Sequence, residues 1–79
     1  MLVRWRTASE IGTLGFHVYR EVNGKRVRVN AKLIAGKGRG SYSFLDRRAP
    51  RRASLRYWIQ EVAPDGTRSW HGPARVVRA

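Results

Sequence analysis

The sequence predicts an all-β fold, an antiparallel β-sandwich or small barrel of about six strands. Apolar residues recur with a period close to two almost everywhere, and turn-forming dipeptides separate the resulting runs. No run has the periodicity of an amphipathic helix, so nothing supplies the helical crossover that parallel strands need. Because 79 residues are too few to divide into two units, residues 1–79 are expected to form a single domain.

The first strand is predicted by strict alternation near the N-terminus. Val3 and Trp5 alternate with Arg4 and Arg6, which is typical of a strand with one buried face. The aromatic and β-branched run at 15–20 favours a second strand.

A hairpin joins the second strand to the third. Asn23 and Gly24 tolerate the positive φ angles that a two-residue type I′ turn requires. Val22 precedes this turn, and residues 25–29 alternate after it, so these segments should pair as its two arms.

A short strand begins the second half of the chain. A glycine-rich loop at 36–40 leads into residues 41–45, where Tyr42 and Phe44 share one face. The segment 47–53 contains a proline, which lacks a ladder donor, and is therefore expected to be a turn or loop.

A longer strand and a final strand complete the predicted set. Apolar and polar residues alternate over 55–60, and the run ends at the turn signal Pro64-Asp65-Gly66. The last strand runs from Thr67 onward. Gly72-Pro73 predicts a bend or an edge position before pairing resumes at 74–77.

Composition limits the classes of function. Lysine and arginine total 17 against 5 acids, and the resulting formal charge of +12 favours an acidic partner over a cationic one. The absence of cysteine excludes a disulfide framework, a thiolate zinc site and a cysteine nucleophile. A chain of this size buries only about 60% of its unfolded surface, so a deep catalytic cavity would remove needed core. We therefore expect no enzymatic activity.

Three short motifs suggest a family. Residues 3–10 read VRWRTASE, residues 15–20 read GFHVYR, and residues 71–73 read HGP. In this order they resemble a fibronectin type III-like domain of bacterial secreted and surface proteins, over roughly Val3 to Val77. The resemblance implies an immunoglobulin-like sandwich used as a spacer, adhesion or protein-interaction module, without catalytic residues. It is the only indication of an extracellular or cell-surface location, because the N-terminus lacks the apolar run of a signal peptide.

Two departures from this family pattern matter. The family's first strand is missing, so the sheet edge near Leu2 to Arg6 is expected to be open to strand addition by another chain, as in a subunit of an assembly. In addition, Leu55 stands where the family often places a tyrosine that hydrogen-bonds across the strand corner, and Tyr57 could partly compensate.

No cofactor or metal site is expected. Without cysteine, His17 and His71 lack the spacing of a zinc site, and we interpret them as a solvent-facing strand residue and part of the bend. No Gly-x-Ser-x-Gly nucleophile motif is present. The sequence GKGRGS at 36–41 lacks P-loop spacing and is interpreted as a flexible loop, with Lys37 and Arg39 as alternative anion contacts.

Positive charge is expected to gather at one end of the sandwich, which we call the basic pole. Successive antiparallel strands place alternate turns at opposite ends, so the turn at 23–24, the loop at 47–53 and both termini should lie together. Only Asp46, at the border, is acidic in this set. The cations of the basic pole are Lys25, Arg26, Arg47, Arg48, Arg51, Arg52 and Arg78.

The leading functional hypothesis is a non-catalytic interaction or scaffolding module, without a small-molecule substrate, that binds an acidic macromolecule or packs into a larger assembly. Arg47, Arg48, Arg51 and Arg52 would carry it, since guanidinium groups bind phosphate, sulfate and carboxylate in a bidentate manner. The alternative is a small nucleic-acid-binding protein without sequence preference. In it, Trp58 and Trp70 lie on neighbouring β-strands and contact the nucleic acid from the outer face of the sheet. A third interpretation assigns the cations to solubility alone.

Overall fold

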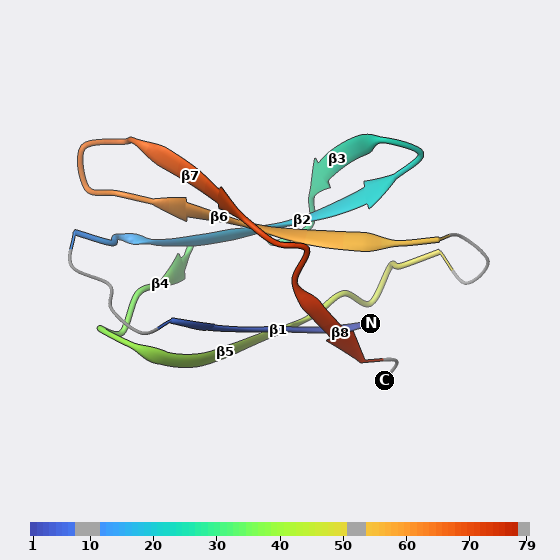
Figure 1. Ribbon diagram of the computed structural model, residues 1–79, viewed down its shortest axis with the longest axis horizontal. Helices are drawn as coiled ribbons and strands as arrows, with labels where there is room; N and C mark the ends of the chain where they lie inside the picture. The colour runs from blue at the N-terminus through green and yellow to red at the C-terminus, as the bar shows by residue number, and fades with distance from the viewer. Residues whose placement is uncertain (8–11, 51–53, 78–79) are drawn as a thin grey trace.

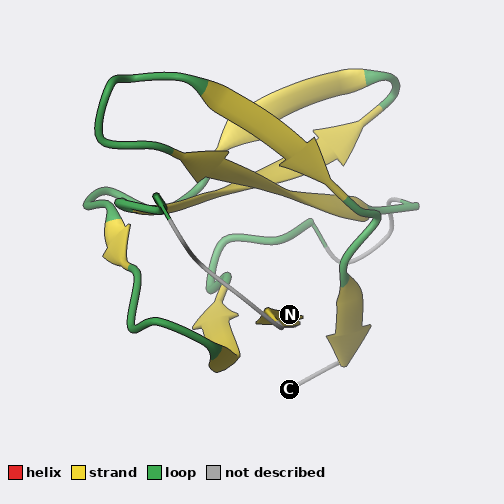
Figure 2. Cartoon of the chain, turned by 60° about the vertical axis from the view of Figure 1, so that its left-hand side comes forward, coloured by secondary structure: helices red, strands yellow, loops and turns green. Residues whose placement is uncertain are grey.

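Two antiparallel β-sheets packed face to face make up the computed structural model, which describes residues 1–7, 12–50 and 54–77 (Figures 1 and 2). Every strand pair runs antiparallel, and the described residues contain no helix, which confirms the all-β class. The interface between the sheets carries the core.

The small sheet has the strand order β5-β1-β8, and the large sheet has the order β3-β2-β6-β7, with β4 also paired to β2. The prediction of about six strands missed the two-residue β4 and the division of the last predicted strand in two. The strand bounds are β1 Leu2–Thr7, β2 Gly15–Val22, β3 Lys25–Arg28, β4 Ile34–Ala35, β5 Gly40–Leu45, β6 Arg56–Val62, β7 Arg68–His71 and β8 Arg75–Val77.

The β2–β3 hairpin forms as predicted. Asn23 and Gly24 have φ angles of 52° and 79°, and Val22 pairs with Lys25 across the two-residue turn. Asparagine and glycine adopt these left-handed angles at low cost, which is why this dipeptide determines the register of the hairpin.

The chain changes sheet at Gly72-Pro73. β7 pairs with β6 in the large sheet, whereas β8 pairs with β1 in the small sheet. Proline cannot donate to a ladder, and the crossing is held instead by the Ala74 N–H, which donates to the Tyr57 carbonyl at 2.7 Å. The predicted bend is confirmed.

This crossing corrects the expectation of an open edge near Leu2 to Arg6 over its first part, Leu2 to Arg4, whereas no described strand pairs with Trp5 and Arg6 on that side. β8 lies along the start of β1, with Leu2 opposite Val77 and Arg4 opposite Arg75. β1 is therefore the central strand of its sheet, between β5 and β8.

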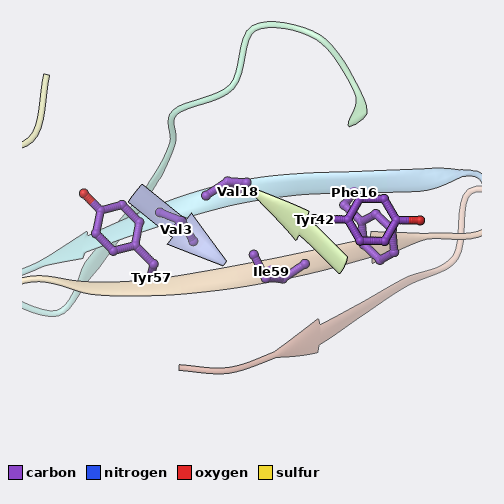
Figure 3. Close-up of a cluster of buried hydrophobic side chains, with 6 residues drawn as sticks. All are labelled: Val3, Phe16, Val18, Tyr42, Tyr57 and Ile59. Atoms are coloured by element: carbon purple, nitrogen blue, oxygen red, sulfur yellow. The ribbon is translucent and has the colours of Figure 1, made fainter. Parts of the chain in front are cut away.

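Because side chains alternate along the strands, one set from each sheet points inward and fills the space between the sheets (Figure 3). Trp5 stacks on Tyr42 with ring centroids 5.4 Å apart, and both rings meet Phe16 at an angle. The buried core consists of Val3, Phe16, Val18, Tyr42, Tyr57 and Ile59.

Asn30 ties β2 to the loop that follows β3. Its Oδ1 accepts the Val18 N–H at 2.7 Å, and its Nδ2 donates to the Lys32 carbonyl at 2.8 Å and lies 3.3 Å from His17 Nδ1. An amide NH₂ can only donate, so a hydrogen bond at this contact has His17 Nδ1 as the acceptor, as in a neutral ring. The prediction that His17 faces solvent is wrong, since it is only 9% exposed beneath this loop.

Stability should depend on the protonation of His17. Burial first, and then the charges of Arg28 and Arg68, lower the pKa of His17 below 6.5. The unfolded chain therefore takes up the proton first, and the free energy of unfolding should fall as the pH drops through about 6.5 and level off below the folded pKa. Urea unfolding across this range should show the fall in wild type and in the control His71→Gln. A fall of equal size in His17→Gln would contradict the assignment.

Candidate interaction surface

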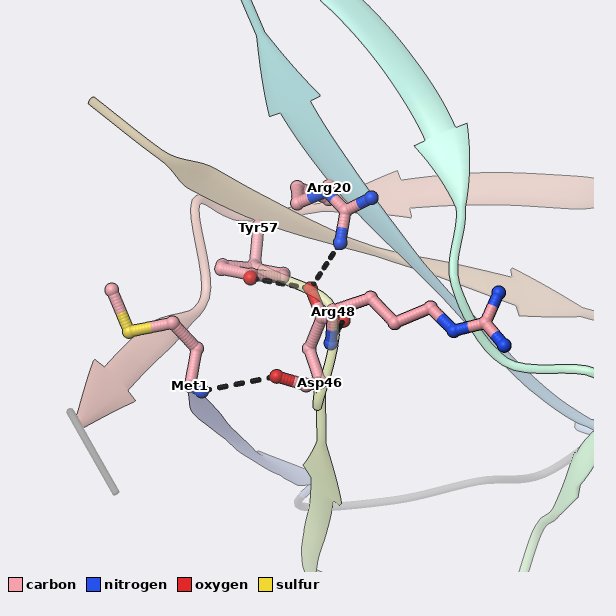
Figure 4. A network of polar contacts seen from close by, with 5 residues as sticks. All are labelled: Met1, Arg20, Asp46, Arg48 and Tyr57. Atoms are coloured by element: carbon pink, nitrogen blue, oxygen red, sulfur yellow. Dashed lines mark hydrogen bonds and ion pairs between the residues drawn. The ribbon is translucent and has the colours of Figure 1, made fainter. Parts of the chain in front are cut away.

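A buried carboxylate, Asp46, organises the corner where β5 ends. Its Oδ2 accepts hydrogen bonds from the Tyr57 hydroxyl at 2.6 Å and from Arg20 Nη1 at 2.7 Å, and its Oδ1 accepts the Arg48 N–H at 3.2 Å (Figure 4). The Asp46 backbone exchanges two further hydrogen bonds with Met1. Asp46 thus connects the end of β5 to the start of β6, to the N-terminus and to Arg48 in the segment after β5.

Charge in this corner is balanced internally. Burial alone would raise the pKa of Asp46, but the hydrogen bonds from Tyr57, Arg20 and the Arg48 N–H, with the positive charge of Arg20, outweigh it and hold the pKa below 3.8. The pKa of the Tyr57 hydroxyl is raised by its burial and by Asp46. Tyr57 makes the hydrogen bond across the corner, two residues after Leu55.

Removing one hydroxyl should expose the value of this network. Tyr57→Phe should lower the free energy of unfolding by about 2 kcal/mol at neutral pH, because a buried carboxylate loses a hydrogen bond. The difference should shrink as the pH falls through the lowered pKa of Asp46, where the stabilisation by the ionised carboxylate is lost. Urea unfolding at neutral pH and over a series of pH values below 3.8 measures both.

Tyr19→Phe is the matched control for this variant. Among the described residues, the Tyr19 hydroxyl makes one long contact, of 3.4 Å to Gln60 Oε1, so its removal should cost little. Equal losses in the two variants, or a loss in Tyr57→Phe that does not change with pH, would rule out the role assigned to Asp46.

A cleft of about 400 Å³, which we call the arginine cleft, opens beside Asp46. Figure 4 shows the Arg48 side chain extending away from Asp46 toward the segment that follows β3. Among the described residues, no carboxylate lies within ion-pair distance of Arg28, Arg47 or Arg48. The cleft has an apolar part, lined by Val27, Val29, Phe44 and Leu45, and an arginine rim, formed by Arg20, Arg28, Arg47 and Arg48. Asp46, which is paired with Arg20, completes the lining.

The structure brings part of the predicted basic pole together. The turn at 23–24, the segment after β5 and the N-terminus lie toward the same end of the molecule, on the right in Figure 1. Lys25 and Arg26 directly follow this turn, and Arg47 and Arg48 belong to the segment after β5. Arg51, Arg52 and Arg78 lie outside the described residues.

The expectation that Asp46 is the only acid near the basic pole is wrong. Glu21 on β2 lies directly opposite Arg26 on β3, and its Oε1 is 3.4 Å from Arg26 Nε. The sequence interpretation placed residues by strand ends, and so overlooked an acid paired across the hairpin. One of the predicted contact cations is therefore already partly neutralised.

Trp58 and Trp70 lie on the large sheet beneath the same guanidinium group. Arg26 Cζ is 4.0 Å from the centroid of Trp58 and 4.7 Å from that of Trp70. Trp58 Nε1 donates to Glu21 at 3.0 Å, and the ring of Tyr19 meets Trp70 at a centroid distance of 4.7 Å. A base stacking against the ring faces that Arg26 covers would have to displace this arginine.

Sequence reasoning missed two contributors to this surface. Tyr19 was not assigned to the outer face, although the alternation that buries Phe16 and Val18 also places Tyr19 on the opposite side. Arg28 was not included in the basic pole, and its place on the rim of the arginine cleft depends on how the two sheets pack, for which no local signal exists.

A larger cleft of about 760 Å³ lies elsewhere, around the part of β1 beyond β8 and the crossing at 72–74. It is lined by Trp5 and Tyr42, and the buried Trp5 Nε1 has no hydrogen-bond partner among the described residues. Arg4 and Arg6 are its only described cations. We therefore place the candidate site at the arginine cleft, which has the smaller volume of the two clefts but carries more arginines.

The remaining motifs show no assembled chemistry. Lys37 in the glycine-rich loop is held against Tyr42, with its Nζ 4.6 Å from the ring centroid and its N–H donating to the hydroxyl at 2.8 Å. His71 Nε2 lies 2.8 Å from Glu61. Within the described ranges, no three histidine or carboxylate side chains group in a way that could hold a metal.

The described part of the chain contains no helix that is long and apolar enough to cross a membrane.

Comparison of the chain with protein-family models, with curated proteins and with solved structures gives no match. These comparisons therefore give no support to a family identity.

Proposed function

We propose that this chain is a non-catalytic β-sandwich module of the fibronectin type III-like kind, which binds an acidic macromolecular partner through the arginine cleft. The observation that carries the proposal is the unequal use of charge. Every described acid has an internal partner, whereas no carboxylate of the described residues lies within ion-pair distance of the Arg28, Arg47 or Arg48 side chains. The internal partners are Arg26 for Glu21, Arg20 for Asp46, His71 for Glu61 and the Thr67 N–H for Asp65.

Arginine suits such a surface. Its planar guanidinium makes two parallel hydrogen bonds to carboxylate, phosphate or sulfate, and it loses water more easily than an ammonium group. Arg47 and Arg48 also start from a rigid base, because Asp46 binds the Arg48 backbone directly. Little backbone entropy is then lost when an anion binds.

The strand order supports the family assignment within this proposal. β2, β6 and β7 lie side by side in the order that an immunoglobulin-like sandwich gives to its C, F and G strands, with β3 beside β2 in the C′ position. β1 and β5 pair as B and E do, and β8 takes the place beside β1 that a first strand would fill.

Salt-dependent binding tests the proposed function. The domain should bind heparin, single-stranded DNA and polyglutamate at about 50 mM salt, and affinity should fall steeply towards about 200 mM as counterion release becomes less favourable. The double variant Arg47→Ala/Arg48→Ala should lose roughly tenfold in affinity, since it removes two charges from the cleft.

Arg4→Ala/Arg6→Ala removes the same charge from exposed positions on β1, away from the arginine cleft, and should lose far less. Equal losses in the two double variants would show that only net charge matters and would overturn the assignment to the cleft. A strong preference for DNA over polyglutamate would favour the nucleic-acid alternative.

A further inference from the structure

β3 lies at the edge of the large sheet with half of its backbone facing outward. In a two-residue hairpin the residues flanking the turn, Val22 and Lys25, bond to each other, and bonding then recurs at every second residue. The Val29 N–H donates to the Val18 carbonyl, which fits this alternation. The N–H and C=O groups of Arg26 and Arg28 therefore point away from β2, where no described strand pairs with them.

The side chains of β3 alternate in the same period. Val27 lines the arginine cleft with Phe44 and Val29, yet it remains 56% exposed. The flanking Arg26 and Arg28 are also exposed. The edge thus presents the apolar Val27 between two arginines. The Arg26 guanidinium lies over Trp58 and Trp70 and pairs with Glu21, whereas Arg28 has no carboxylate within ion-pair distance among the described residues.

Resting on the proposed function, we propose that β3 binds an extended acidic polypeptide as a further strand of the large sheet. The peptide backbone bonds to the outward N–H and C=O groups of Arg26 and Arg28. An apolar residue opposite Val27 enters the arginine cleft, and an aspartate or glutamate next to it pairs with Arg28, because side chains on paired strands alternate together.

Charge selects this occupant over a second copy of the chain. The edge reads Lys25-Arg-Val-Arg28, and a protein with a formal charge of +12 would bring like charges together by pairing two such edges. An acidic strand has the complementary pattern. A nucleic acid has no row of amides to pair with β3, so it would leave the open backbone and Val27 unused.

Capped octapeptides test this with the whole 79-residue chain. A peptide in which Glu alternates with Val should bind roughly tenfold more tightly than one with the same residues in two blocks, and one in which Lys alternates with Val should not bind. Bound peptide should protect the Arg26 and Arg28 amides from hydrogen exchange. Equal affinity of the alternating and block peptides would overturn the proposal.

Backbone pairing is tested without altering the protein. N-methylation of alternate peptide residues blocks one edge of the bound strand, so methylating all Glu amides and methylating all Val amides should have opposite effects, with one set abolishing binding and the other tolerated. Equal effects of the two sets would show that no strand forms.

Arg28→Ala and Arg28→Pro form a matched pair in the protein. Both remove the charge, but only proline removes the outward N–H, and an edge position tolerates proline. Arg28→Pro should therefore bind the alternating peptide roughly tenfold more weakly than Arg28→Ala, while the two bind heparin alike. Equal affinity of two folded variants for the peptide would count against pairing at β3.

The outcomes separate this inference from the proposed function. If heparin and polyglutamate bind but the alternating peptide has no advantage, the strand-pairing proposal fails and the acidic-partner function stands. If none of these ligands binds at low salt, the proposed function itself fails.

Discussion

The ionised side chain of Asp46 is the constraint on which the rest of the structure depends. Burying a carboxylate is costly unless its oxygens are fully hydrogen-bonded, and here Tyr57, Arg20 and the Arg48 N–H all donate to it. These donors come from β6, β2 and the segment after β5. The same residue therefore joins the two sheets, orients the wall of the arginine cleft and, through its backbone, holds Met1 in the small sheet.

The placement of charge follows from this use of acids inside the fold. Glu21, Asp46 and Glu61 each form an ion pair with Arg26, Arg20 or His71, so none of them pairs with the side chains of Arg28, Arg47 or Arg48. A net charge of this size in a small domain attracts anions from a distance and repels other copies of the same protein. Arg26 shows that some cations serve the fold as well, since its guanidinium covers Trp58 and Trp70.

Much of the fold could be predicted from the sequence, because strands and hairpin turns leave local signals. Alternation located β1, β2, β5 and β6, and Asn23-Gly24 located the hairpin. The change of sheet at Gly72-Pro73 could not be predicted, since the partner of β8 lies at the other end of the chain. The candidate site was predicted only in part: the cations of the pole were expected, but the cleft and Glu21 depend on register and packing between distant segments.

The pairing of β8 with β1 also has a consequence for how the chain folds. Leu2 and Val77 are neighbours in the small sheet although nearly the whole chain separates them, and contacts of such large sequence separation form slowly because a long loop must close first. During synthesis from the N-terminus, β1 gains this neighbour only after the last strand has emerged. Until then one flank of β1 stays open, and the high positive charge of the chain limits association between nascent copies during that interval.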